Sequence, residues 1–348
     1  MDATTIAIDL AKDVFQIAIG DGRGQIRARR RLTRRQFAAF VETLDARTTV
    51  VMETCGTAHY WGRRCAARGA TVRLLPAQYV RPYVRRDKTD RADTEALLEA
   101  HRCGGIHAVP IKSVEQQMIQ GLHRVRQQWQ TTRIARINLL RGLLREQGLA
   151  FPKGRAGCHC LTAVIADPDT PVPALLRMTL ATVLDELRLA TEHVHALDRQ
   201  LAQLARTLPV TQRLQQIPGV GVIIATALVG SVPDIHAFRR GRHFASWLGL
   251  TPRESSSGLK RTIGRMSKRG DTYLRTLLVH GARSALRGAQ LRVTRATPGT
   301  SALQHWAVTV ATRRGRNRAA VAFANKLARI IWAVWSREMD FVSPVLAA

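Results

Sequence analysis

The sequence predicts an α/β domain at the N-terminus, long helices in the middle and a mainly helical C-terminal region. Three observations support this division. Short β-branched runs alternate with helical patterns up to residue 108. Leucine and isoleucine then recur at three- and four-residue steps with few glycines or prolines, and a glycine turn and basic segments follow from residue 209. We therefore expect domains at residues 1–108, 109–208 and 209–348.

The N-terminal domain is expected to contain a mixed sheet covered by helices. Its first three strands form a meander, because an Asp21-Gly22 turn separates the second strand from the third. Helices and strands then alternate along the chain. The expected strands are 4–8, 14–19, 26–31, 48–52 and 70–75, and the expected helices are 34–44, 58–68 and 90–101.

The middle region is expected to form two long amphipathic helices, within 111–150 and 174–208. Their heptads are imperfect, so a coiled coil and ordinary helix packing both remain open. Prolines and glycines between the helices predict a loop or flexible tip. We interpret Cys158-His159-Cys160 in that segment as loop residues, because no second ligand pair at zinc spacing accompanies them.

The chain is strongly basic. Its 54 Lys and Arg residues exceed its 25 Asp and Glu residues, which gives a formal net charge of +29. Such an excess opposes compaction unless a polyanion neutralises it, and nucleic acid is the expected partner. The hydrophobic content of 45% excludes a disordered basic tail.

Other features favour a cytoplasmic location. No run of 18 or more apolar residues predicts a membrane span, and the first residues, MDATTIAIDL, do not resemble a secretory leader. Five scattered cysteines do not suggest a disulfide framework, which fits a reducing compartment.

Four acidic residues occupy informative positions. Asp9 and Glu53 each end an apolar strand, where a carboxylate points into the crevice at the edge of the sheet. Asp90 and Asp93 lie three residues apart and face the same side of a helix. Four carboxylates this close repel unless cations neutralise them, and Mg²⁺ or Mn²⁺ prefers oxygen ligands. The pattern predicts a divalent-metal site of the kind that acts on phosphodiesters.

Each acid also has an ordinary structural interpretation, since an acid at a strand end can cap the next helix and Asp90 fits an N-cap. The joint pattern favours the metal site, because acids are scarce and two of them lie in a strongly basic stretch. That stretch is expected to hold phosphates around the acidic pocket. The residues concerned are Arg81, Arg85, Arg86, Lys88 and Arg91.

The C-terminal region opens with a helix-hairpin-helix pattern, IPGVGV at 217–222. Gly219 and Gly221 would let backbone N–H groups approach a phosphate. Ten Lys or Arg residues lie between positions 239 and 275, opposed by only two acids. Nucleic-acid contacts are expected at Lys260, Arg261, Arg265, Lys268 and Arg269.

A second basic group lies between Arg313 and Arg329 and could touch either RNA or DNA. We interpret the aromatic residues of this region, Trp306 among them, as core residues rather than base-stacking platforms.

These motifs resemble the DEDD transposases of the insertion-sequence one-ten family. The N-terminal resemblance lies in IDLAK at 8–12, METCG at 52–56 and KTDRAD at 88–93. The C-terminal resemblance lies in IPGVG at 217–221, FASWLGLTP at 244–252, SSG at 256–258 and KRGDTYLR at 268–275. The resemblance implies an RNase H-like, RuvC-type catalytic domain at the N-terminus and a transposase domain at the C-terminus.

The resemblance further implies a recombinase that cleaves and rejoins DNA at the ends of its own element and at the target. Similar enzymes use a structured bridge RNA that pairs with donor and target DNA, and they assemble as tetramers. Their active site joins the metal-bound acids of one subunit to a serine of another. By motif, the four acids take the carboxylate positions and Ser257 is the nucleophile. Ser256 is the second choice, because serines occupy 255–257 in a row.

A serine hydroxyl needs activation, which a metal ion supplies by lowering its pKa. Gly258 would permit the tight backbone that exposes Ser257. Without the resemblance, residues 255–258 suggest only a polar loop.

Two other functions stay open. One is a RuvC-like, structure-selective endonuclease that uses water as its nucleophile, in which Ser257→Ala leaves hydrolysis intact. The other is non-catalytic nucleic-acid binding, in which Asp9→Asn leaves all activity intact.

Overall fold

The structure is a computed structural model that describes residues 4–21, 25–84, 90–152, 154–295 and 301–342. The side chains at 90, 155, 156 and 158 are outside that description. The chain divides into two compact units, residues 1–116 with 232–237 and residues 117–231 with 238–348. No helix in the described ranges is both long and apolar enough to cross a bilayer.

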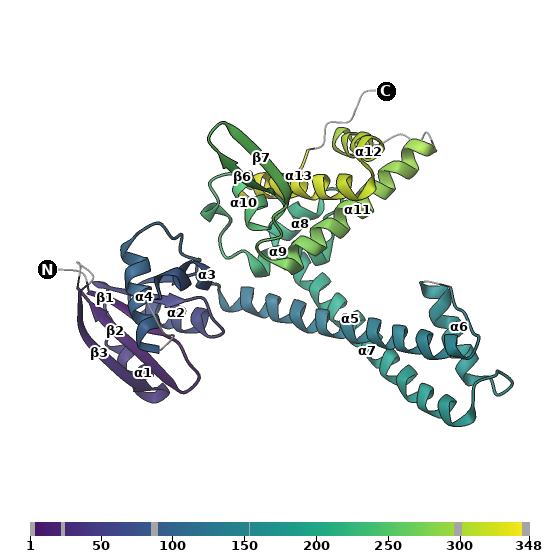
Figure 1. Cartoon of the computed structure of the whole chain (residues 1–348), viewed down its shortest axis with the longest axis horizontal. Helices are drawn as coiled ribbons and strands as arrows, with labels where there is room; N and C mark the ends of the chain where they lie inside the picture. The colour runs from purple at the N-terminus through teal and green to yellow at the C-terminus, as the bar shows by residue number, and fades with distance from the viewer. Residues whose placement is uncertain (1–3, 22–24, 85–89, 153, 296–300, 343–348) are drawn as a thin grey trace. The chain divides into compact units, whose positions relative to one another are not determined.

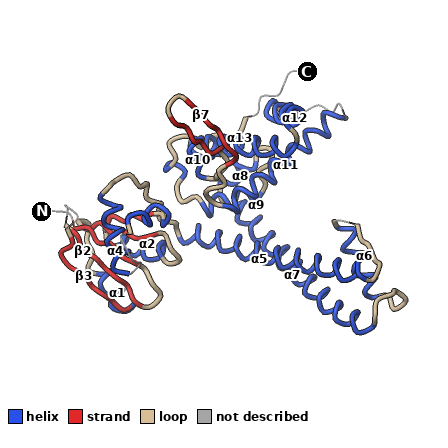
Figure 2. The backbone as a smooth tube through the Cα atoms, in the orientation of Figure 1, coloured by secondary structure: helices blue, strands red, loops and turns tan. Residues whose placement is uncertain are grey.

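The first unit contains a five-stranded sheet (Figure 2). The strands are β1 (Thr4–Asp9), β2 (Val14–Gly20), β3 (Ile26–Thr33), β4 (Thr48–Glu53) and β5 (Thr71–Leu75). Their order is β3-β2-β1-β4-β5, with β2 antiparallel to both neighbours and β1, β4 and β5 parallel. The predicted mixed sheet and the meander of its first three strands are therefore confirmed.

Helices cover both faces of this sheet. They are α1 (Arg34–Glu42), α2 (Ala58–Ala67), α3 (Ala77–Val80), the 3-10 turn η1 (Arg81–Tyr83) and α4 (Asp90–Arg102). On the face covered by α1 and α2, Phe15 and Phe37 stack with ring centroids 4.3 Å apart. Trp61 meets Phe37 edge-on at 4.6 Å. Burying each of these rings stabilises the fold by roughly 1.5–3 kcal/mol.

The middle of the chain forms a pair of long helices, as predicted, and nearly all of both helices belongs to the second unit. The helices are α5 (Val114–Glu146), α6 (Arg155–Ala166) and α7 (Ala174–Thr207). Arg126 binds Asp198, and further along α5, Arg136 binds Glu186. Because the partner numbers fall along α7 as they rise along α5, the two helices lie side by side and antiparallel.

The loop predicted between the two long helices is wrong in part, because α6 occupies its centre. Leu161 and Ile165 of α6 are buried against Leu140 of α5 and Leu180 of α7. A short apolar stretch that can reach a neighbouring core forms a helix even between proline-rich flanks.

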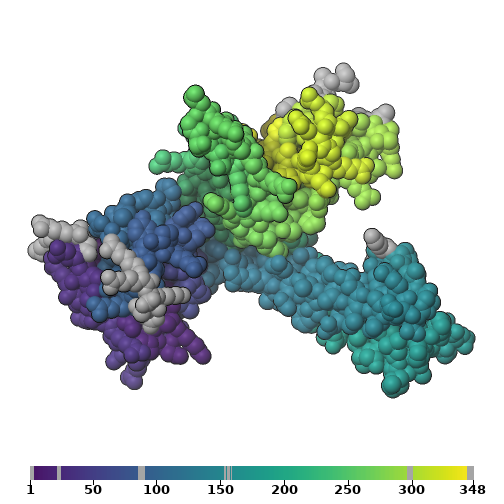
Figure 3. All heavy atoms as spheres, in the orientation of Figure 1, coloured from purple at the N-terminus to yellow at the C-terminus, as the bar shows by residue number. Residues whose placement is uncertain are grey.

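The remainder of the second unit is mainly helical, as predicted. Its elements are α8 (Pro209–Gln215), α9 (Val222–Ser231), α10 (Gly241–Trp247), β6 (Pro252–Ser257), β7 (Lys260–Met266), α11 (Thr272–Thr294), α12 (Ala302–Arg314) and α13 (Arg316–Ser336). A further 3-10 turn, η2 (Ile235–Ala237), belongs to the first unit. α11, α12 and α13 pack beside one another (Figure 1). The β6–β7 hairpin, which the sequence did not predict, projects from these helices (Figure 3).

Candidate active site

The two acids predicted at strand ends lie side by side. β1 and β4 are parallel neighbours, and Ile8 of β1 is level with Met52 of β4. One residue further along each strand are Asp9 and Glu53, at the carboxyl edge of the sheet. Adjacent strands are about 4.8 Å apart. Both acids are half-buried, and each already has at least one polar, ionic or other electrostatic contact within the protein.

Both acids lie on the face of the sheet that α4 covers. Side chains two residues apart on a strand share a face, so Asp9 shares the face of Ala7 and Glu53 shares the face of Val51. Ala7 and Val51 are buried in one cluster with residues of α4. α4 therefore packs on the same face of the sheet as the two acids.

The direction of α4 brings its first turn toward the same edge. Leu98 lies 3.5 Å from the position of a Cβ on Gly20, which is beside the start of β1. One turn earlier, Glu95 binds Arg29 at 2.7 Å, about halfway along the sheet. The helix therefore runs antiparallel to β1, and its first turn, which contains the predicted acid pair, points toward the end of β1.

The structure thus brings together two of the four predicted acids and directs the segment with the other two toward them. Asp93 is half-buried, and the side chain of Asp90 lies outside the described part of the chain. Among the side chains that are described, no three from His, Cys, Asp and Glu gather closely enough to hold a metal ion. The predicted donor set fits a hard divalent cation in its chemistry, since every donor is a carboxylate oxygen.

Glu95, which follows the predicted acid pair on α4, is paired with two arginines. Arg29 and Arg91 both bind Glu95, at 2.7 and 3.3 Å. The hydrogen bond from Arg29 is the main cause of a lowered pKa of Glu95. Arg81 is exposed in η1. Three further predicted phosphate contacts lie outside the described residues: Arg85, Arg86 and Lys88.

The three serines lie on the β6–β7 hairpin and not in an irregular loop. Ser256 pairs with Arg261, and Ser257 pairs with Lys260. Gly258 follows at the turn with φ of 54°, a region that glycine adopts readily. Glycine in the first of two turn positions is typical of a type II′ hairpin. The tight backbone expected there is present, and all three serines are exposed.

Ser256 and Ser257 point to opposite faces of the hairpin, because neighbouring strand residues alternate. Ser256 Oγ donates to Glu254 Oε1 at 3.1 Å. Arg261 Nε donates to the same oxygen at 2.9 Å, and this contact is the main cause of a lowered pKa of Glu254. Ser257 lies on the other face, across from Lys260.

The predicted basic contacts of the C-terminal region are exposed, namely Lys260, Arg261, Arg265, Lys268 and Arg269. The end of the KRGDTYLR motif has a structural role instead. Asp271 caps α11 by accepting from Leu274 N at 2.9 Å. Arg275 is buried and donates to Leu248 O at 3.3 Å.

Gly219 has a packing role that the sequence did not reveal. Its φ is 91°, and a Cβ there would lie 2.7 Å from the carbonyl oxygen of Gly281 on α11. Gly221 is exposed, and within the described part of the chain nothing lies within 4 Å of its Cβ position. Close helix packing therefore accounts for Gly219, and phosphate approach at this turn stays a prediction.

Two basic surface features were not predicted from the sequence. The first is β3, the edge strand of the sheet, which exposes Arg27, Arg29, Arg30 and Arg31. The alternating pattern of a strand with one buried face is missing from it, because nearly all of its side chains face solvent. The arginine-rich run RARRR at 27–31 could have indicated this basic edge from the sequence.

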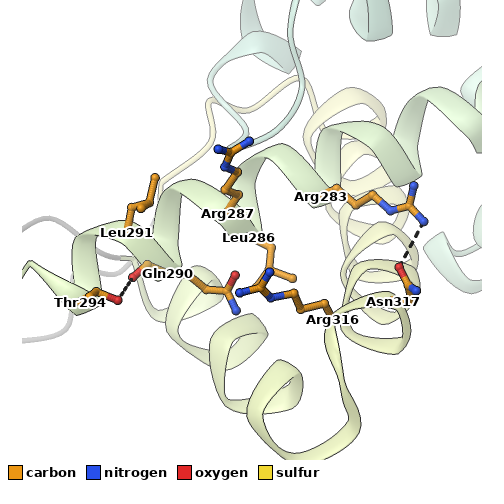
Figure 4. Close-up of a pocket in the computed structure, with 8 residues that line it drawn as sticks. All are labelled: Arg283, Leu286, Arg287, Gln290, Leu291, Thr294, Arg316 and Asn317. Carbon is orange, nitrogen blue, oxygen red and sulfur yellow. Dashed lines mark hydrogen bonds between the residues drawn. The ribbon is translucent and has the colours of Figure 1, made fainter. Parts of the chain in front are cut away.

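The second feature is a pocket of about 480 Å³ between α11 and the start of α13 (Figure 4). Arg283, Arg287 and Arg316 line it, and Arg283 donates to Asn317 at 3.4 Å. Arg283 and Arg287 lie one turn apart on α11, which the sequence shows, but their meeting with α13 depends on tertiary packing.

Comparison with known proteins identifies the family. A family model described as a transposase of the IS116/IS110/IS902 family matches residues 211–296, and a DEDD transposase model of IS110 elements matches residues 6–148. The chain is 43% identical to a "Probable family 20 transposase" of Pseudomonas aeruginosa, over 97% of this chain and 98% of the relative. It is 38% identical to the transposase for insertion sequence element IS1111A of Coxiella burnetii, over 98% and 92%. The transposase for element IS1328 of Yersinia enterocolitica is 34% identical over 98% and 99%. The chain therefore belongs to the IS110 family, which is the insertion-sequence one-ten family, and is a DNA transposase.

Proposed function

We propose that this transposase cleaves and rejoins DNA at the ends of its insertion sequence and at the target, guided by a structured bridge RNA. Asp9, Glu53, Asp90 and Asp93 hold Mg²⁺ or Mn²⁺, and Ser257 attacks the phosphodiester. The first unit acts as an RNase H-like, RuvC-type domain, and the enzyme assembled on DNA is a tetramer.

The observation that supports this proposal most strongly is the adjacency of Asp9 and Glu53. Two half-buried carboxylates at neighbouring strand ends repel each other, and a divalent cation removes that repulsion. A bound metal ion would lower the pKa of a nearby hydroxyl and stabilise the departing oxygen of a phosphodiester. The direction of α4 lets the other two acids join the same edge.

The hairpin geometry favours Ser257 over Ser256. The hydroxyl of Ser256 is directed to Glu254, a carboxylate that repels a phosphate. Ser257 stands across from Lys260, which can hold the phosphate under attack. Attack by Oγ forms a phosphoserine ester, breaks the bond from phosphorus to a deoxyribose oxygen, and leaves a DNA hydroxyl that takes up a proton. Reversal on another strand end rejoins the DNA.

Exposed cations on both units support the part of the proposal that the protein binds RNA as well as DNA. The first unit presents the arginines of β3, and the second unit presents those of the hairpin and of the Arg283 pocket. Each phosphate that these cations neutralise releases counterions. A protein with a net charge of +29 can therefore bind both a guide RNA and DNA.

The test uses the full chain, the RNA that co-purifies with it, and DNA that contains the element ends. We expect a Mg²⁺-dependent adduct between DNA and Ser257, identified by mass spectrometry. Ser257→Ala should lose both the adduct and strand transfer, whereas Ser256→Ala should retain them. Asp9→Asn should lose cleavage without lowering the melting temperature, and ribonuclease treatment should stop target choice.

Two outcomes would contradict the proposal. Mg²⁺-dependent hydrolysis that persists in Ser257→Ala would indicate a water-using endonuclease. Cleavage that is unchanged in Asp9→Asn would remove the acidic site from the reaction.

A further inference from the structure

A pocket of about 810 Å³ lies at the base of the serine hairpin. Pro252 at the start of β6 and Met266 at the end of β7 form one wall. α12 and α13 supply the other walls, through Trp306 and Val321 among others. Pockets of 300–1,000 Å³ are of the size that holds small organic ligands.

The pocket combines an apolar lining with positive charge. Leu250, Met266, Trp306 and Val321 contribute apolar surface. The cations at its wall and rim are Arg265, Arg318, Lys326 and Arg329, and none of the described residues that line the pocket is acidic. This combination suits a ligand that is flat and apolar at one end and anionic at the other.

Trp306, which the sequence analysis interpreted as a core residue, is placed to contact such a ligand. It is half-buried and lines the pocket. Lys326 Nζ lies 4.1 Å from the centroid of its ring. An aromatic ring with a cation beside it provides a surface for a base and a charge for the adjoining phosphate.

The wall of the pocket is held in place by the surrounding structure. Asn325 on α13 donates to Leu250 O at 3.1 Å, which ties that helix to the segment leading into β6. Ser267 N donates to Thr251 O at 2.9 Å and closes the base of the hairpin. The pocket is therefore continuous with the element that displays the serines.

We propose that this pocket binds one unstacked nucleotide of a single strand, with its base against Trp306 and Val321 and its phosphate on Arg265 and Lys326. Ser257 is five residues from Pro252 along β6, or about 17 Å, so the bound nucleotide lies a few nucleotides from the phosphate under attack. This placement near the reaction rests on the proposed function, but occupancy of the pocket does not. DNA and RNA share the chemistry of base and phosphate, so both are tested.

The test compares binding of (dT)₆ with binding of a base-free hexamer of the same charge, measured on the full chain without Mg²⁺. Stacking of one base contributes roughly 1–3 kcal/mol, so (dT)₆ should bind about 10-fold more tightly. Val321→Trp fills the pocket and should bring the ratio of the two affinities close to 1. Val293→Trp adds the same ring at an exposed valine outside the pocket and should leave the ratio unchanged.

A parallel pair of (rU)₆ and a base-free RNA hexamer identifies the source of the strand. If Val321→Trp lowers the affinity ratio only for the DNA pair, the pocket binds DNA. If it lowers the ratio only for the RNA pair, the pocket binds RNA. Equal ratios in wild type and Val321→Trp, for both polymers, would overturn the proposal.

Photo-crosslinking keeps the test decisive if Val321→Trp does not fold. An oligonucleotide with 5-iodouracil should crosslink to Trp306 in the wild-type chain, and crosslinks confined to other residues would contradict the proposal. Ser257→Ala should keep both the affinity ratio and the crosslink. Failure of strand transfer in that variant therefore bears on the nucleophile and not on the pocket.

Discussion

Gly281 on α11 should tolerate no side chain, whereas Gly288 on the same helix should accept one. A Cβ on Gly281 would lie 2.1 Å from the carbonyl oxygen of Gly219 and 2.7 Å from Ile224 Cδ1. The first contact is with backbone, so it cannot be relieved by a rotamer change. Overpacking of this kind destabilises by roughly 1–3 kcal/mol, against a helix-propensity gain of about 1 kcal/mol for Gly→Ala.

Gly288 is the matched control, because no atom of the described residues lies within 4 Å of its Cβ position. Gly288→Ala should therefore be stabilised by the helix-propensity difference of about 1 kcal/mol, with no packing cost. For a unit of this size, 1 kcal/mol changes the melting temperature by roughly 2–4 °C. Calorimetry of the second unit's transition should show Gly281→Ala melting up to several degrees below wild type and Gly288→Ala roughly 2–4 °C above it. If Gly281→Ala melts as far above wild type as Gly288→Ala does, the close approach of the glycine turn to α11 is not present in solution.

Two further predictions concern the two units separately. His123 bonds Tyr273 Oη at 2.9 Å and Thr226 Oγ1 at 3.0 Å, and burial lowers its pKa to about 4. The unfolded chain takes up a proton on this imidazole near pH 6.5, whereas the folded chain takes it up only near pH 4. The contribution of the neutral His123 to folding stability is therefore complete above pH 6.5 and is lost as the pH falls to 4. The second unit's melting temperature should drop over this window, and less steeply in His123→Gln; equal slopes would contradict this. In the first unit, Phe37→Ala should cost about 3–5 kcal/mol, and calorimetry should show its transition falling while that of the second unit stays in place.

The sequence predicted the first unit well because its signals are local. Apolar runs such as IAI at 6–8 and VVM at 50–52 identify buried strands, and the acids that end them need only parallel pairing to meet at one edge. The positions of Asp9 and Glu53 followed from that rule. The approach of α4 did not, because its direction depends on packing of Leu98 and its neighbours against the sheet.

The second unit shows where local signals fail. β6 reads PRESSS and every one of its residues is exposed, so no alternation of apolar and polar side chains indicates a strand. The pairing of β6 with β7 depends on the Gly258 turn at one end and on the hydrogen bond from Ser267 N to Thr251 O at the other. Gly219 likewise fits a phosphate-binding turn in the sequence, and only the position of Gly281, 62 residues away, reveals the packing role. The pocket around Trp306 has the same origin, since its walls come from three separate segments.

The two halves of the proposed active site differ in burial, and this difference predicts that they differ in rigidity. Asp9 and Glu53 end strands in the interior of a five-stranded sheet that is buried on both faces. The serines lie on a two-stranded hairpin whose side chains are almost all exposed, and such hairpins are marginally stable by themselves. Amide hydrogen exchange should therefore be slow in β1 and β4 and fast in β6 and β7 of the free protein. If the hairpin moves to present Ser257 to a DNA strand, its amides should become protected when DNA binds. Slow exchange in the free hairpin would instead mean that the serines are held as rigidly as the acids, and that strand engagement needs no ordering of the hairpin.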